Sequence, residues 1–143
     1  MPELLNCLEF VNADNIAKGL SPFNVEKVAF EAGRIMLIRI DELLRQGVDF
    51  AVETTLSSKS YISIIKNAKS KGYAIRMLYI WLESAEVAVD RVATRVEQGG
   101  HNIPEEIIRR RYERGLQNLF KHYIPIVDSW TLINNTHEDF DRI

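Results

Sequence analysis

The chain has 143 residues, of which 46% are hydrophobic and 27% are charged, with a net charge of −2. These values are typical of a globular protein of one domain, so we expect residues 1–143 to form a single domain. No apolar stretch approaches the length of a membrane span, which excludes a membrane protein of the usual helical kind. The single cysteine, Cys7, excludes an internal disulfide, and the N-terminus does not resemble a signal peptide, so we expect a cytoplasmic protein.

Positive charge is concentrated in the middle of the chain. Residues 61–122 carry 11 Lys and Arg against 7 Asp and Glu, whereas both flanking segments are acidic. A basic segment in an acidic protein favours a small anionic ligand over a long polyanion. RNA binding through residues 109–114 is the weaker alternative, because the aromatic residues are spread along the chain and form no platform for stacked bases.

The first half of the chain predicts two strands and three helices. Residues 8–12 (LEFVN) read as a short strand, followed by a short helix over 15–19. Asn24 is a candidate N-cap for a long helix that ends at Gly47, since apolar residues recur there at helical spacing. A second strand covers 50–54 (FAVET), and a helix covers 58–71 with Gly72 as its stop.

The second half continues the alternation of strands and helices. The apolar run 74–82 is typical of a strand buried in a parallel sheet. Ser84 caps a helix that Gly99 and Gly100 break, and Pro104 starts another helix that runs to about His122. Residues 130–134 (WTLIN) form the last strand. This alternation predicts an α/β fold with a parallel sheet and helices on both of its faces.

Ligands of such sheets bind beyond the carboxyl ends of the strands. The residues that leave those ends are Asp14, the segment 53–55 (Glu-Thr-Thr), Glu83 and the segment 134–136 (Asn-Asn-Thr). Asp14 and Glu53 are two carboxylates that suit orienting a hydroxyl and taking its proton, or holding a hydrated Mg²⁺. The alternative is structural: Asp14 caps the helix 15–19, and Glu53 is a carboxylate with a local partner.

Arginines flank the pair of glycines at 99 and 100. Arg91 and Arg95 lie one helical turn apart on one helix, and Arg110 and Arg114 share a face of the next. Guanidinium groups suit phosphate oxygens, and a Gly-Gly link between two such helices suits a lid that closes over a ligand. The alternative is a solvated surface that pairs with nearby glutamates.

Four motifs, taken in order, resemble the zeta-toxin-like P-loop kinases of bacteria. They are FVNAD-x-IA-x-GLSPFN, FAVETTLS, KGYAIRMLYIWL and VATRVEQGGHNIPEEIIRRRYERGLQNLF. The resemblance runs from about residue 8 to residue 135. It implies a phosphotransferase that uses ATP and Mg²⁺ to phosphorylate the sugar hydroxyl of a UDP-activated amino sugar, and it implies an antitoxin protein or a second copy of the chain as possible partners.

The resemblance also implies roles for particular residues. Asp14 matches the catalytic base, and Arg91 and Arg95 match the arginines of the lid. Asn12 and the turn Glu53-Thr54-Thr55 match the substrate-binding segment. The turn departs from the Glu-Gly-Thr of typical zeta toxins, so the resemblance leaves room for a different substrate. The resemblance also assigns nucleotide binding to His101, Arg110 and Asn135.

One part of a P-loop kinase is absent from the sequence. The seven glycines stand at 19, 33, 47, 72, 99, 100 and 115, and none belongs to a G-x-x-x-x-G-K-[ST] motif after a strand. We therefore expect an N-terminally truncated kinase domain without activity of its own, or alternatively a non-catalytic relic that binds a sugar nucleotide or a protein. The resemblance puts the strand that bears the loop between strands 50–54 and 74–82. We expect these two strands to pair directly, or another chain to fill the slot between them.

Overall fold

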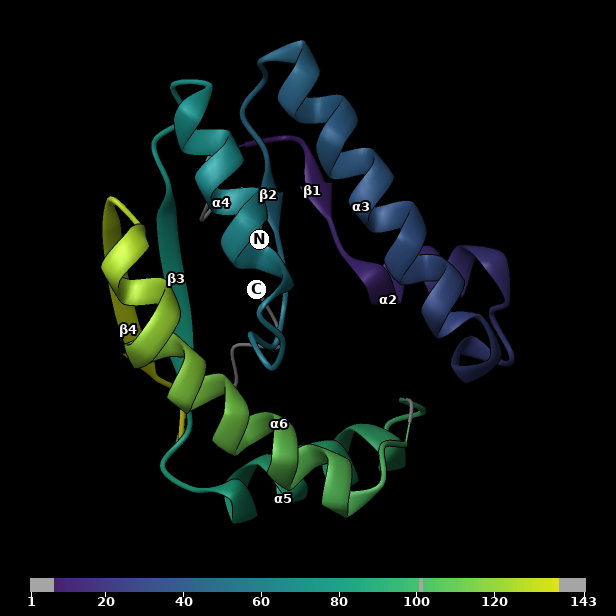
Figure 1. The fold of residues 1–143 in the computed structure, drawn as a ribbon. Coiled ribbons are helices and arrows are strands. Elements are labelled where there is room, and N and C mark those ends of the chain that lie inside the picture. Colours follow the sequence, from purple (N-terminus) through teal and green to yellow (C-terminus); the bar gives the residue numbers. More distant parts are fainter. Residues whose placement is uncertain (1–6, 101, 137–143) are drawn as a thin grey trace. The chain divides into compact units, whose positions relative to one another are not determined.

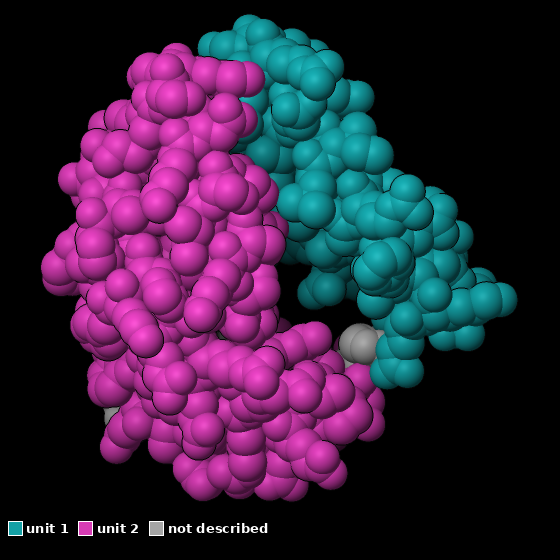
Figure 2. Space-filling view, in the orientation of Figure 1, with its two compact units in different colours: residues 1–54 teal, residues 55–143 magenta. Residues whose placement is uncertain are grey.

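A computed structural model describes residues 7–100 and 102–136 of the chain (Figure 1). The chain forms two compact units, residues 1–54 and residues 55–143 (Figure 2). Each unit contains parallel strands and helices, so the expected mixed α/β class with parallel pairing is confirmed. Within the described residues, no helix combines the length and the apolar character that crossing a bilayer requires.

The first unit is built on one long helix. Its elements are β1 (Phe10–Val11), α2 (Ala13–Leu20), the 3-10 helix η1 (Val25–Val28), α3 (Ala29–Gln46) and β2 (Ala51–Val52). The long helix predicted from Asn24 begins as η1, and Asn24 precedes it without a capping bond from its side chain. Gly47 ends α3 as predicted, because its left-handed φ of 69° lets its N–H reach the carbonyls of the last turn.

The core of the first unit lies along one face of α3. Five α3 side chains recur at helical spacing and are buried, and Val11 of β1 and Ala17 of α2 are buried as well; the α3 residues are Ala32, Met36, Ile40, Leu43 and Leu44. Beside this core, β1 and β2 pair in parallel, with Phe10 opposite Ala51 and Val11 opposite Val52. Their carboxyl ends therefore lie next to each other.

The second unit has a helix before its first strand and two helices between its strands. Its elements are α4 (Ser60–Ser70), β3 (Arg76–Trp81), α5 (Ala85–Glu97), α6 (Glu105–Asn118), the π-helix η2 (Leu119–Tyr123), the 3-10 helix η3 (Ile124–Ile126) and β4 (Ser129–Asn134). Ser84 caps α5 as predicted, accepting a hydrogen bond from the Val87 N–H at 3.3 Å.

Strands β3 and β4 pair in parallel from Arg76 opposite Ser129 to Trp81 opposite Asn134. Asp128 sets this register at the start of β4. Its carboxylate accepts a hydrogen bond from the Ile75 N–H at 2.7 Å, and its own N–H donates to the Ile75 carbonyl at 2.9 Å. These bonds and the Lys69 ammonium, 3.5 Å away, hold the pKa of Asp128 below its ordinary value.

The core of the second unit is centred on Leu56, Leu119 and Tyr123, which are all buried. Partly buried side chains of α4, β3, α6 and η3 surround them; they include Tyr61, Ile62, Ile65, Met77, Tyr79, Leu116, Ile124 and Ile126. The turn that follows β2 in the sequence therefore contributes a central residue, Leu56, to this core.

The direct pairing expected between strands 50–54 and 74–82 stays a prediction, because β2 belongs to the first unit and β3 to the second. The described strands form two separate two-stranded sheets, β1 with β2 and β3 with β4. The chain between β2 and β3 consists of the turn at Leu56 and helix α4, whose contacts lie within the second unit. This connection does not require the two strands to be neighbours, because a crossover helix also joins strands that have another strand between them.

Candidate functional site

Asn12 connects the two strand ends of the first unit. Its Oδ1 accepts hydrogen bonds from the N–H groups of Asp14 and Asn15, at 2.7 and 3.1 Å, and so caps α2. Its Nδ2 donates to the Glu53 carboxylate at 2.5 Å. One side chain therefore uses both of its polar atoms, fixing the start of the helix and the orientation of the carboxylate that follows β2.

Asp14 lies in the first turn of α2, where the partial positive charge of the helix N-terminus favours a carboxylate. The alternative role that the sequence allowed for it, capping a helix over 15–19, is wrong, because the helix begins at Ala13 and Asn12 is the cap. The Asp14 side chain is exposed, and no hydrogen bond or ion pair engages it among the described residues. Its carboxylate is thus accessible for work as a base.

The turn after Glu53 is polar and exposed at its start. Thr54 and Thr55 are both exposed, and the Thr55 hydroxyl shares a hydrogen bond of 2.8 Å with the Ser57 hydroxyl. Glu53 and Thr54 belong to the first unit and Thr55 to the second. The first unit thus brings together three of the residues expected at the substrate site, namely Asn12, Asp14 and Glu53, around the ends of β1 and β2.

In the second unit, Arg91 and Asn135 lie together. The Arg91 guanidinium on α5 donates to the Asn135 carbonyl and, at 3.3 Å, to the Thr136 carbonyl. The turn after β4 is further held by Thr136, whose hydroxyl accepts from the Glu83 N–H at 3.0 Å and donates to Asn134 Oδ1 at 2.7 Å. Arg91 is therefore tied to the backbone that follows β4.

A pocket of about 440 Å³ opens beside this turn, at the carboxyl ends of β3 and β4. Its size is within the range of small-molecule sites. Two carboxylates, of Glu83 and Asp90, and the Arg91 guanidinium line it, so it offers both negative and positive charge to a polar ligand. The lining residues are Glu83, Ser84, Val87, Asp90, Arg91, Thr94 and Thr136.

The glycine pair after α5 is a well-defined helix end. Gly99 adopts φ 87°, and the Gly100 N–H donates to the Arg95 carbonyl at 2.6 Å, as in a Schellman motif. A Cβ on Gly100 would lie 2.6 Å from the same carbonyl oxygen. Both glycines are therefore required by the backbone of this helix end, and the lid expected at this link stays a prediction. Arg95 is exposed on the last turn of α5, while His101 lies outside the described residues.

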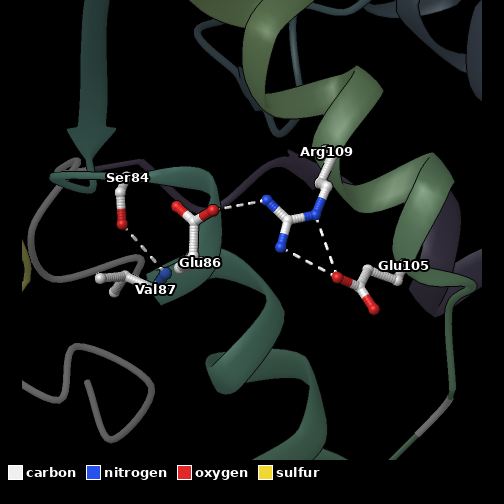
Figure 3. Close-up of polar contacts among 5 residues, drawn as sticks. All are labelled: Ser84, Glu86, Val87, Glu105 and Arg109. Carbon is white, nitrogen blue, oxygen red and sulfur yellow. Dashed lines mark hydrogen bonds and ion pairs between the residues drawn. The ribbon is translucent and has the colours of Figure 1, made fainter.

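Arg109 joins helices α5 and α6 (Figure 3). Its guanidinium contacts Glu86 of α5 at 2.7 Å and Glu105 of its own helix at 2.9 Å. The hydrogen bond from Arg109 lowers the pKa of Glu86, and the two carboxylates raise the pKa of Arg109. The structural alternative for the arginine run thus holds for Arg109, whereas Arg110 and Arg114 are exposed on α6.

Two polar residues that sequence reasoning missed are anchored deep in the second unit. Asn118 is 8% exposed and donates to the Leu56 carbonyl at 2.7 Å, and the Tyr112 hydroxyl donates to the Leu82 carbonyl at 2.7 Å. The signal for Asn118 was present in the sequence, because an amide within the apolar run LQNLF is either exposed or has a specific partner.

The phosphates of ATP need a cradle of backbone N–H groups at closely packed glycines. The two glycines whose added Cβ would clash, Gly100 and Gly115, face the carbonyls of Arg95 and Thr55 and leave no room for a ligand. The described residues also contain no group of three or more His, Cys, Asp or Glu side chains that suits a metal ion. Neither of these two glycines therefore forms an open backbone cradle of the kind that phosphates need.

Polar side chains at the carboxyl ends of parallel strands lie where ligands bind in α/β proteins. Residues 12–137 match the family model described as Zeta toxin. The chain is also 33% identical over 102 residues to an uncharacterized protein of Haemophilus influenzae, a match that covers 71% of this chain and 73% of that protein. The chain belongs to the zeta toxin family, whose fold is that of P-loop kinase-like phosphotransferases.

Proposed function

We propose that this chain supplies the acceptor-binding part of a zeta-toxin-type kinase whose substrate is a UDP-activated amino sugar. The observation that carries the proposal is the arrangement at the ends of β1 and β2. There Asn12 holds the Glu53 carboxylate at 2.5 Å, and Asp14 presents a carboxylate without a protein partner among the described residues. A fixed carboxylate beside an accessible one suits the hydroxyl-rich sugar part of such an acceptor.

In this proposal Asp14 accepts the proton of the acceptor hydroxyl. Glu53 accepts hydrogen bonds from sugar hydroxyls, and its hydrogen bond to Asn12 lowers the entropy that it loses on binding. Thr54 and Thr55 add hydroxyl groups on the same turn. In the second unit, the exposed Arg95 and Arg110 offer guanidinium groups that suit a phosphate group.

Phosphoryl transfer itself requires a phosphate-binding loop that this sequence does not contain. We propose that the loop belongs to a strand between β2 and β3, so that the complete sheet has three layers with helices on both faces. The pairing is compatible with this idea, since β2 and β3, like β1 and β4, each have a single hydrogen-bonded neighbour among the described strands. Without that strand and loop, the chain binds an acceptor and transfers no phosphate.

The test combines a binding measurement with an activity measurement. Calorimetric titration of the purified chain with UDP-N-acetylglucosamine is expected to show binding, and incubation with ATP and Mg²⁺ is expected to yield no phosphorylated sugar. Absence of binding by the 143-residue chain would contradict the acceptor site. Phosphorylation above a mock preparation would contradict the requirement for a separate loop.

The base is tested in a form of the protein that includes a Walker A segment. Asp14→Asn is expected to lower turnover by about 10²–10⁴, the usual cost of removing a general base, without loss of the fold. Asp49→Asn is the matched control, because Asp49 is also an exposed acid next to a strand but precedes β2 at its amino end. Equal turnover in the two variants would show that Asp14 is not the base.

A protein partner is a separate proposal. Phe23 and Phe30 are 103% and 82% exposed, respectively, which is unusual for phenylalanine. Such exposure favours a partner protein that covers these side chains. We propose that this partner is an antitoxin or a second copy of the chain. Sedimentation analysis of the purified chain distinguishes a dimer from a monomer, and a monomer leaves the antitoxin as the proposed partner.

A further inference from the structure

The turn of residues 55–58 is held in a strained conformation by one face of α6 and η2. Leu56 has a φ of 56°, a left-handed value that a leucine rarely adopts. Its side chain is nevertheless 7% exposed and lies in the core of the second unit. Such a conformation persists only where the surrounding structure fixes it, so the contacts that surround this turn explain why it is stable.

Three residues on α6 and η2 supply those contacts. Asn118 Nδ2 donates to the Leu56 carbonyl at 2.7 Å, and the hydroxyl of Tyr123 donates to the Ser58 carbonyl at 2.7 Å. Gly115 lets the backbone of the turn approach, because a Cβ at that position would lie 2.8 Å from the Thr55 carbonyl oxygen. Three carbonyls of the turn thus meet one helical face, those of Thr55, Leu56 and Ser58.

These contacts are more specific than the fold requires. Asn118 and Tyr123 are buried, at 8% and 0% exposure, and each uses its polar atom on a carbonyl of the turn. Burial raises the pKa of Tyr123, so its hydroxyl keeps its proton and remains a donor. An apolar side chain at 118 would fill the core equally well but would leave the Leu56 carbonyl without its partner.

We propose that Gly115, Asn118 and Tyr123 are positioning residues that fix the turn 55–58 and thereby set the affinity for the acceptor through Thr55. This inference rests on the proposed function, in which Thr55 contacts a UDP-amino sugar. The three residues do not touch the acceptor. They hold the backbone that carries Thr55 in the conformation that binds it.

The experiment compares variants that loosen the turn with variants that make the same chemical change elsewhere. Asn118→Asp and Tyr123→Phe each remove one hydrogen bond to the turn, and Gly115→Ala places a Cβ against the Thr55 carbonyl oxygen. Tyr112→Phe removes a tyrosine-to-carbonyl bond of the same 2.7 Å length on the same helix, directed at Leu82. Gly33→Ala adds a Cβ on helix α3 in open space.

Amide hydrogen exchange measured by NMR on the whole chain reports the turn directly. Exchange of the amides of residues 56–58 is expected to rise about tenfold in each of the three variants and to stay unchanged in both controls, since one lost hydrogen bond corresponds to about that factor. Titration with UDP-N-acetylglucosamine is expected to show about tenfold weaker binding in the same three variants. A purely structural role would instead raise exchange throughout the second unit.

The outcomes separate this inference from the proposed function. If the unmodified chain does not bind the sugar nucleotide, the proposed function fails. Amide hydrogen exchange at residues 56–58 then decides by itself whether the three residues fix the turn. Unchanged exchange at 56–58 in the folded variants, or an equal rise in Tyr112→Phe, would overturn the inference. Faster exchange with unchanged affinity would overturn the positioning role. Tyr123→Phe keeps the test decisive if Asn118→Asp does not fold, because it removes only a hydroxyl.

Discussion

The double role of Asn12 yields a prediction that separates its two polar atoms. Asn12→Ala removes the side chain that caps α2 through the N–H groups of Asp14 and Asn15. Loss of such a cap typically costs about 1 kcal/mol, which lowers the ratio of folded to unfolded protein about fivefold and the melting temperature by roughly 2–6 °C. Asn24→Ala is the matched control, because Asn24 stands at the start of η1 without a capping bond and its loss is expected to cost little.

The variant Asn12→Asp tests the other polar atom, Nδ2, which donates to Glu53. Aspartate caps helices as well as asparagine does, so α2 keeps its cap, but a carboxylate replaces the amide that donates to Glu53 at 2.5 Å. Two carboxylates held this close repel each other at pH 7, and measurement at about pH 3 weakens the repulsion because acid neutralises carboxylates.

Urea denaturation of the three variants at both pH values provides the measurement. The deficit of Asn12→Ala is expected at both pH values, since no ionisation is involved, whereas that of Asn12→Asp is expected to be larger at neutral pH. A variant Asn12→Asp as stable as the unmodified chain at pH 7 would refute the contact with Glu53. An Asn12→Ala variant no less stable than Asn24→Ala would refute the cap.

Two further predictions concern the second unit. Gly100→Ala is expected to lower stability by about 1–3 kcal/mol, the usual cost of overpacking, because its Cβ would lie 2.6 Å from the Arg95 carbonyl oxygen, while Gly33→Ala has open space and serves as the control; equal melting temperatures would contradict this geometry. The pKa of Asp128 is depressed by the Ile75 N–H, so its contribution to stability is present above its ordinary value of 3.8 and is lost as the pH falls through the lower folded value. Asp128→Asn is therefore expected to flatten the fall of stability in acid, and an unchanged acid profile would contradict that contribution.

The positions of the strands and helix ends could be predicted from the sequence because their causes are local. The Ser84 cap and the glycine stop at Gly47 depend on residues within one turn of each helix end. The start of α2 was predicted two residues too late, because both Asn12 and Asp14 are residue types that cap helices. Only the backbone conformation at Asn12, which is extended, decides between them.

The contacts of the candidate site could not be predicted in the same way, because their partners are far apart in the sequence. Asn12 meets Glu53 across 41 residues, Arg91 meets Asn135 across 44, and Asn118 meets Leu56 across 62. The sequence identified Asn12, Glu53, Arg91 and Asn135 as candidates through the strand-end rule and the family resemblance. It contained no pattern that paired them, because such pairs depend on strand register and helix packing.

The contacts at the two ends of α6 determine how this helix presents Arg110 and Arg114. Near its start, α6 is fastened to α5 by Arg109 and Glu86, and near its end it is fastened to the turn at Leu56 by Asn118. Arg110 and Arg114 lie between these two attachments and are exposed. Moving α6 away from Thr55 would break the buried hydrogen bond of Asn118, which is costly to leave unmade, as well as the exposed ion pair of Arg109 with Glu86. We therefore expect α6 to present its arginines in a fixed arrangement relative to Thr55, so that preorganisation rather than closure of α6 supplies their charge.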